Sequence, residues 1–178
     1  LGVHPDTCHH LEDIPFLPID FFKTHAIMTG GNKYEWVFNS SGTAGVERST
    51  HYIKKPELYT KSYEQAFRLF YGSPEEYCIM GLLPGYVENK HSSLISMAKG
   101  LIEKSEHPFS GFYLDNLGDL KERLVELDKK GEQILLLGVS FALLDLVEYH
   151  PMQLKNTIVM ETGGMKGRRK EITRDELH

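Results

Sequence analysis

The chain has 178 residues, of which 40% are hydrophobic and 25% are charged, a composition typical of one ordinary globular domain with its own core. Its 25 acidic residues outnumber its 20 basic ones, and the resulting net charge of -5 gives no positive field of the kind that binds nucleic acid. Two cysteines, Cys8 and Cys78, are too few for the disulfide framework of a small secreted domain. We therefore expect a cytoplasmic protein whose partners do not include nucleic acid.

The longest apolar run, ILLLGVSFALLDLV at 134–147, is interrupted by Gly138, Ser140 and Asp145 and is shorter than the roughly 20 residues of a membrane span. Neither a membrane span nor a signal peptide is therefore expected. The first residue is not Met, and the last residues, RDELH, have the pattern of a helix start. These two features predict a fragment of a longer protein, which self-associates through an uncovered edge of its sheet.

The N-terminal part of the chain is predicted to be irregular at first and then a β-hairpin. Residues 1–33 contain three prolines among large apolar side chains, which predicts an extended docking segment that packs on a core formed elsewhere. YEWVF at 34–38 and STHYI at 49–53 have strand composition, so FNSSGTAG at 38–45 is predicted to be the turn between two short strands. The next stretch, 56–72, has a proline near its start and a glycine at its end, as a helix would.

From residue 77 onward, apolar runs of strand length alternate with helical stretches. The predicted strands are YCIMGLLP at 77–84, GFYL at 111–114, ILLLGV at 134–139 and NTIVME at 156–161. The predicted helices are SSLISMAKGLIEKS at 92–105, DLKERLVELDKKG at 119–131 and SFALLDLVEY at 140–149. Strands without polar alternation are buried on both faces, and their alternation with helices indicates a parallel sheet. We predict an α/β fold over residues 34–178, with a largely parallel sheet flanked by helices.

Two kinds of segment suggest a binding site. The hydroxyl groups and exposed N–H groups of the stretch 38–45 suit phosphate oxygens, although a plain polar turn has the same composition. The stretch is not a Walker A loop, because VER follows it where that pattern requires Gly-Lys-Ser/Thr. Three further polar, glycine-bearing segments, LPGYVENKHSS, GVS and ETGGMKG, follow predicted strands. Ligands of parallel sheets bind at these carboxyl ends, so a site is expected there.

SSGTAG resembles the SSGTTG or TSGSTG phosphate loop of the adenylate-forming superfamily, which uses ATP to convert carboxylic acids to acyl-AMP. From about residue 15 to the end, further stretches resemble, in order, the acyl-protein synthetase family of the bacterial luminescence fatty-acid reductase system. They are PFLPIDFFKTH, FNSSGTAG with STHYI, LLPGY with SSL, SGFYL, LLGVSFALLDL and TIVMETGGMKGRRKEITRDELH. The resemblance implies that residues 1–178 are a single incomplete adenylation domain, part of the family's large N-terminal domain.

The resemblance also implies a reaction and its partners. A carboxylic acid, in this family a fatty acid, would be activated by ATP to acyl-AMP and transferred to a thiol. The acceptor would be coenzyme A or a protein cysteine, such as one on an acyl reductase subunit. Mg²⁺ would be a second cofactor with ligands outside this chain, because the family's later motifs would follow His178. The chain alone is therefore expected to be inactive, and we assign it no metal ligands and no catalytic residue.

Site residues carry over from the matching motifs. The resemblance places the ATP phosphates against Ser40, Ser41, Gly42, Thr43, Ala44, Gly45 and Arg48. It places the adenine side against Thr162, Gly163, Gly164, Met165 and Lys166. The acyl pocket would be bordered by Leu83, Pro84, Gly85, Tyr86 and Ser140. The chain departs from the family at two points. Ala44 lacks the hydroxyl group usual at its position, and the lysine found downstream in many relatives is absent. Arg48 either substitutes for that lysine or is a solvated side chain without such a role.

Two other functions remain open. GVSFA at 138–142 is close to the G-x-S-x-G nucleophile elbow of α/β-hydrolases, with Ser140 as the nucleophile. His150 and His178 are the histidines that follow it, and Ser140 can instead be a helix N-cap or a wall of the acyl site. Alternatively, the chain is a non-catalytic docking module whose nucleotide loop is vestigial. The terminal cluster HPDTCHH lacks the spacing of a metal site.

Overall fold

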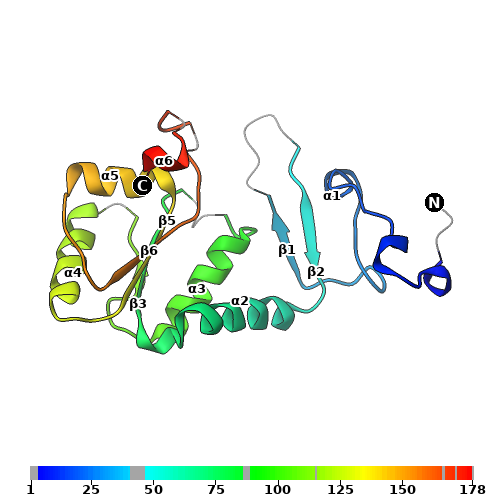
Figure 1. Cartoon of the computed structure of the whole chain (residues 1–178), viewed down its shortest axis with the longest axis horizontal. Helices are drawn as coiled ribbons and strands as arrows, with labels where there is room; N and C mark the ends of the chain where they lie inside the picture. The colour runs from blue at the N-terminus through cyan, green and yellow to red at the C-terminus, as the bar shows by residue number, and fades with distance from the viewer. Residues whose placement is uncertain are drawn as a thin grey trace. The chain divides into compact units, whose positions relative to one another are not determined.

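The computed structural model of the chain describes residues 4–40, 47–85, 89–114, 116–165, 167–170 and 172–177 (Figure 1). The chain forms two compact units, Leu1–Lys54 and Lys55–His178. The first unit holds the irregular N-terminal segment and a two-stranded sheet. The second holds a four-stranded sheet with its helices. Within the described residues, no helix combines the length and the apolar character needed to cross a membrane.

The first unit contains the predicted hairpin. Its strands β1 (Trp36–Asn39) and β2 (Thr50–Ile53) pair antiparallel, with Asn39 opposite Thr50, which confirms the two strands predicted here. The segment before them forms short helical turns, η1 (Pro5–Thr7), η2 (Leu11–Asp13) and α1 (Phe21–Thr24). Large apolar side chains of this segment are exposed, among them Phe16 at 97%. Its role as a docking segment stays a prediction.

The second unit is an α/β domain, as the alternation of strands and helices predicts. Its sheet has the order β4-β3-β5-β6, and every pairing is parallel. The strands are β3 (Cys78–Leu82), β4 (Gly111–Phe112), β5 (Ile134–Gly138) and β6 (Thr157–Glu161). The helices are α2 (Pro56–Tyr71), α3 (Ser93–Ser105), α4 (Leu117–Lys129), α5 (Ser140–Tyr149) and the short η3 (Pro74–Glu76) and α6 (Arg174–Leu177).

Helices cover both faces of this sheet. On one face, alternate strand residues such as Ile79 and Leu135 pack in a cluster with Phe67 of α2. On the other, their neighbours Met80 and Leu136 belong to a second cluster, which includes side chains of α4 and α5. In Figure 1 the sheet accordingly lies between α4 and α5 on one side and α2 and α3 on the other. Burial on both faces explains why the central strands are continuously apolar.

Local signals in the sequence set the helix ends. Pro56 is at the start of α2, and Gly72 ends it with φ 88°, a backbone conformation that glycine adopts without strain. A capping box lies at the start of α6, where the sequence predicts the beginning of a helix. The Thr173 N–H donates to the Glu176 carboxylate at 2.7 Å, and the Glu176 N–H donates to the Thr173 hydroxyl at 3.3 Å.

A buried carboxylate joins α4 to the start of β6. Asp128, near the end of α4, is 7% exposed and accepts hydrogen bonds from the N–H groups of Lys155 and Asn156 at 2.8–3.0 Å. The Thr157 hydroxyl donates to the same carboxylate at 2.8 Å. Burial alone would raise the pKa of Asp128, but these hydrogen bonds outweigh it and hold the pKa below its ordinary value. The carboxylate thereby fixes where β6 begins.

Candidate functional site

Three of the predicted site segments meet at the carboxyl edge of the parallel sheet. Leu83–Gly85 follows β3, Val139 and Ser140 follow β5, and Thr162–Gly164 follows β6. The strands β3, β5 and β6 are neighbours in the sheet, so their ends lie side by side (Figure 1). The backbone bonds the segments together, because the Val139 N–H donates to the Leu82 carbonyl and the Thr162 N–H to the Gly138 carbonyl. The edge expected from the sequence therefore exists.

The turn after β6 depends on its glycines. Gly163 has φ 78° and Gly164 has φ 102°, both in the region that side-chain-bearing residues rarely adopt. The Thr162 hydroxyl donates to the Gly138 carbonyl at 3.2 Å, and the Gly164 carbonyl accepts from the Phe141 N–H at 3.4 Å. The turn is thus fixed against the first residues of α5 while Thr162 and Gly164 remain exposed.

Not every residue of the predicted adenine side faces solvent. Met165 is 5% exposed and packs in the hydrophobic cluster beneath the turn. Its burial makes it a core residue that supports the turn from below. Lys166 lies outside the described residues. Of this predicted set, Thr162, Gly163 and Gly164 are therefore the ones that the structure presents at the edge.

Glu161, the last residue of β6, is a site residue that the sequence analysis missed. Its carboxylate atom Oε1 accepts a hydrogen bond from the Gly163 N–H at 2.5 Å. The same atom accepts one from the hydroxyl of Ser140. Glu161 therefore connects the glycine turn to the start of α5. The signal available in the sequence was its position, a carboxylate at a strand end two residues before a pair of glycines.

Ser140 has neither the N-cap position nor the surroundings of an activated nucleophile. Val139 is the N-cap of α5 and Ser140 the first helical residue, so the N-cap interpretation of Ser140 is wrong. Its side chain is buried and donates to Glu161. His150 caps the opposite end of this ten-residue helix, about 15 Å away at the helical rise per residue. His178 lies outside the described residues. Of the two histidines that follow Ser140, the one within the described residues, His150, is therefore not beside it.

The predicted acyl side and a nearby cation occupy the β3 end of the edge. Leu83 is fully buried in the core, Pro84 is half-buried and Gly85 is exposed, while Tyr86 lies outside the described residues. The guanidinium carbon of Arg168 lies 5.0 Å from the centre of the Phe141 ring. One guanidinium nitrogen is 3.8 Å from where a β-carbon on Gly85 would be. Arg168, which was not predicted as a site residue, places positive charge beside this edge.

The predicted phosphate side belongs to the first unit of the chain. The Ser40 N–H donates to the Ser49 carbonyl at 3.0 Å, and the Ser40 hydroxyl accepts from the Ser49 N–H at 2.9 Å. Ser40 thus extends the hairpin pairing beyond β1. Arg48 is exposed. The remaining residues of this prediction, Ser41, Gly42, Thr43, Ala44 and Gly45, lie outside the described residues.

No protein-family model, curated protein or solved structure matches the chain in the comparisons made with them. In the described part of the chain, no three side chains of His, Cys, Asp or Glu converge as metal ligands. The carboxyl edge offers a glycine turn, a carboxylate and a nearby guanidinium.

Proposed function

We propose that this chain is part of an acyl-activating enzyme that uses ATP to convert a carboxylic acid, of the fatty-acid class, to acyl-AMP and then transfers the acyl group to a thiol. The observation that carries the proposal is the turn Thr162–Gly164 at the carboxyl edge of the sheet. Thr162 and Gly164 of the motif that resembles the family's adenine side are exposed there. It lies beside GVS and LPG, the segments assigned to the acyl side.

The proposed reaction has two steps, both nucleophilic substitutions. A carboxylate oxygen attacks the α-phosphorus of ATP, a P–O bond forms, and pyrophosphate leaves with the electrons of the bond that breaks. A thiolate then attacks the acyl carbon, the C–O bond to the phosphate breaks, and AMP leaves. The thiol proton passes to solvent, so no oxidant or reductant is needed. Positioning of the reactants and stabilisation of negative charge are the contributions such a reaction needs from the protein.

The exposed turn suits a flat base. Two glycines at positive φ expose the backbone without a β-carbon, so an adenine ring can approach it closely. Glu161 is a positioning residue in this proposal, because it accepts from Gly163 and Ser140 and so keeps the turn against α5. Arg168 is the charged group beside the edge that can attract a phosphate or a carboxylate.

The described residues do not fit a Mg²⁺ site. Oxygen ligands for Mg²⁺ would have to come from one or two carboxylates together with the phosphates of ATP. Glu161 is the one carboxylate on the carboxyl edge described above, and it already accepts hydrogen bonds from Gly163 and Ser140. No step of the proposal is therefore assigned to a metal ion held by these residues. The expectation that its ligands lie outside this chain stays a prediction.

ATP–pyrophosphate exchange tests the activity. In the full-length protein that carries this sequence, exchange of labelled pyrophosphate into ATP should require a carboxylic acid and increase with aliphatic chain length. A pure preparation that shows no exchange with any aliphatic or aromatic acid would overturn the proposal. Exchange without any added acid would equally contradict it.

Two glycine variants test the site. Gly164→Ala should raise KM for ATP about tenfold, because alanine at positive φ costs on the order of 1–2 kcal/mol and displaces the turn. Gly131→Ala is the matched control: Gly131 has φ 79°, open space around its β-carbon position, and lies in the loop that precedes β5. It should lose similar stability without a change in KM. Equal KM values for ATP in both variants would show that the turn is not part of the ATP site.

Equilibrium binding separates the proposal from the docking-module alternative. A non-hydrolysable acyl-AMP analogue should shift the amide signals of Gly163 and Gly164 in nuclear magnetic resonance spectra. Absence of binding at about 1 mM, equivalent to roughly -4 kcal/mol or weaker, would favour a non-catalytic module.

A further inference from the structure

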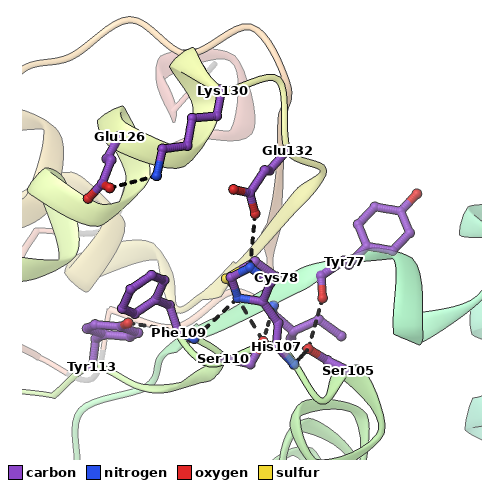
Figure 2. A network of polar contacts seen from close by, with 11 residues as sticks. Tyr77, Cys78, Ser105, His107, Phe109, Ser110, Tyr113, Glu126, Lys130 and Glu132 are labelled. Atoms are coloured by element: carbon purple, nitrogen blue, oxygen red, sulfur yellow. Dashed lines mark hydrogen bonds and ion pairs between the residues drawn. The ribbon is translucent and has the colours of Figure 1, made fainter.

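A second cluster of polar side chains lies at the amino-terminal edge of the sheet, away from the carboxyl-edge site. Figure 2 shows Ser105, His107, Ser110 and Glu132 around the beginning of β3. The cluster borders an open cavity of about 360 Å³. The proposed function uses none of these residues, so their arrangement needs an explanation of its own.

His107 makes two side-chain hydrogen bonds, which together determine which ring nitrogen carries the proton in the neutral form. Its Nδ1 atom accepts from the Phe109 N–H at 3.2 Å. Its Nε2 atom lies 2.9 Å from a carboxylate oxygen of Glu132. A neutral imidazole carries one proton, and since Nδ1 accepts, that proton is on Nε2 and is donated to Glu132. The ring thus bridges the turn after α3 and the loop that precedes β5 (Figure 2).

The turn that His107 holds leads into the edge strand of the sheet. The Ser110 N–H donates to the His107 carbonyl at 2.9 Å, and the Ser110 hydroxyl accepts from the Ile79 N–H at 2.8 Å. Strand β4 follows at once and has only two residues, Gly111–Phe112. So short a strand has few ladder bonds of its own, and it depends on the turn for its position.

Charged side chains from several elements surround the ring. Glu75 and Glu76 of η3, Glu106 after α3, and Glu132 line the cavity with His107. The Cys78 thiol is also there, but burial raises its pKa to about 11, so it remains neutral. The nearby cations have partners of their own: Arg68 with Glu75, Lys104 with Glu64, Lys130 with Glu126, and Arg123 over the Phe109 ring. Of the groups that line the cavity, the Glu132 carboxylate contacts the ring directly, 2.9 Å from Nε2.

We propose that His107 is a pH-sensitive switch, in which protonation of the imidazole exchanges its hydrogen bond to the Phe109 N–H for an ion pair with Glu132. The protonated ring carries hydrogen on both nitrogens, so Nδ1 can no longer accept. Meanwhile the bond from Nε2 to Glu132 becomes charge-assisted and keeps the ring beside β5. The turn at residues 107–110 loses a tether, and β4 is the strand that loosens on acidification.

A pH titration followed by nuclear magnetic resonance tests this switch in the whole chain. Between about pH 8 and pH 5, the amide proton signal of Phe109 should move with the same midpoint as the His107 ring signals. The protection factor of that amide, taken relative to an unstructured peptide at the same pH, should fall about fivefold, the effect of losing one ordinary hydrogen bond. A Phe109 amide that stays constant while the ring titrates would overturn the proposal. So would ring nitrogen signals that place the proton on Nδ1 at neutral pH.

Two variants separate the switch from a purely structural role. In His107→Asn, the amide oxygen accepts from the N–H two residues later without titrating, so Phe109 should stay protected at both ends of the pH range. Glu132→Gln keeps an acceptor for Nε2 but removes the charge, so the turn should persist and Phe109 should stay protected at neutral pH. Loss of Phe109 protection with falling pH in His107→Asn, or its loss at neutral pH in Glu132→Gln, would contradict the mechanism.

Discussion

Close packing between α2 and α3 allows a substitution whose two effects oppose each other. Gly100 lies inside α3, where alanine would ordinarily stabilise the helix by about 1 kcal/mol. A β-carbon there, however, would lie 2.1 Å from the hydroxyl oxygen of Tyr63 and 3.1 Å from the ring carbon that bears it. The Tyr63 ring packs edge-on against Tyr59, with ring centres 5.5 Å apart, so moving it disturbs a second contact.

The steric effect is expected to win. Overpacking of this kind costs about 1–3 kcal/mol, so Gly100→Ala should lower the free energy of unfolding by about 1 kcal/mol after the gain in helix propensity. In a Tyr63→Phe background the hydroxyl is gone and the nearest ring atom is 3.1 Å away. There the same substitution should be neutral or stabilising by up to about 1 kcal/mol, which makes the coupling between the two positions about 1–2 kcal/mol.

Urea unfolding followed by far-ultraviolet circular dichroism measures the cycle, because the long helices all belong to the second unit. The four proteins required are the unaltered chain, each single variant and the double variant. Stabilisation by Gly100→Ala in both backgrounds would refute the reasoning, since propensity alone would then decide the outcome. Equal destabilisation in both backgrounds would show that the clash involves an atom other than the Tyr63 hydroxyl.

Three further predictions concern the buried carboxylate, the serine and the free sheet edge. Asp128→Ala should cost about 3 kcal/mol in urea unfolding, because the N–H groups of Lys155 and Asn156 lose their acceptor. The pKa of Asp128 in the folded protein lies below the ordinary 3.8, so its contribution to the free energy of unfolding should be complete above pH 3.8 and should disappear as the pH falls below that value. The free energy of unfolding of Asp128→Asn, measured against pH, should not show this loss in acid. A fluorophosphonate probe should leave Ser140 unlabelled in mass spectra, and labelling there would favour the hydrolase instead. β6 is the last strand in the order of the sheet, and Val159 on it is 53% exposed. The chain should therefore self-associate, as measured by light scattering, and Val159→Lys should reduce the association. A monomer at high concentration would contradict this prediction.

Much of the fold follows from patterns that depend on a few neighbouring residues. The apolar runs that became β3 and β5 are buried on both faces, and burial of that kind leaves its mark directly in the sequence. The ends of α2 are equally local, because proline and glycine constrain their own backbone. In these places, propensity and tertiary packing favour the same structure.

The candidate site could be predicted only in part, because side-chain roles there depend on residues far apart in sequence. Met165 was assigned to the adenine side by its place in a motif, yet its side chain is buried in the hydrophobic core. Glu161 was overlooked because its partners Ser140 and Gly163 come from two different strand ends. Likewise, the His107–Glu132 pair joins positions that no local pattern relates.

The bonds of Asp128 also bear on the order in which the second unit folds. They join α4 to residues 155–157, fewer than 30 positions along the chain, and so close a loop that contains β5 and α5. Because of the chain entropy, closing a loop of that size costs only about 0.6 kcal/mol more than closing a loop of half the length. Pairing of β3 with β5 closes a loop about twice as long, from Cys78 to Ile134, so we expect the Asp128 loop to close first. We expect Asp128→Ala to slow folding rather than merely speed unfolding, since the contact would already be present in the transition state.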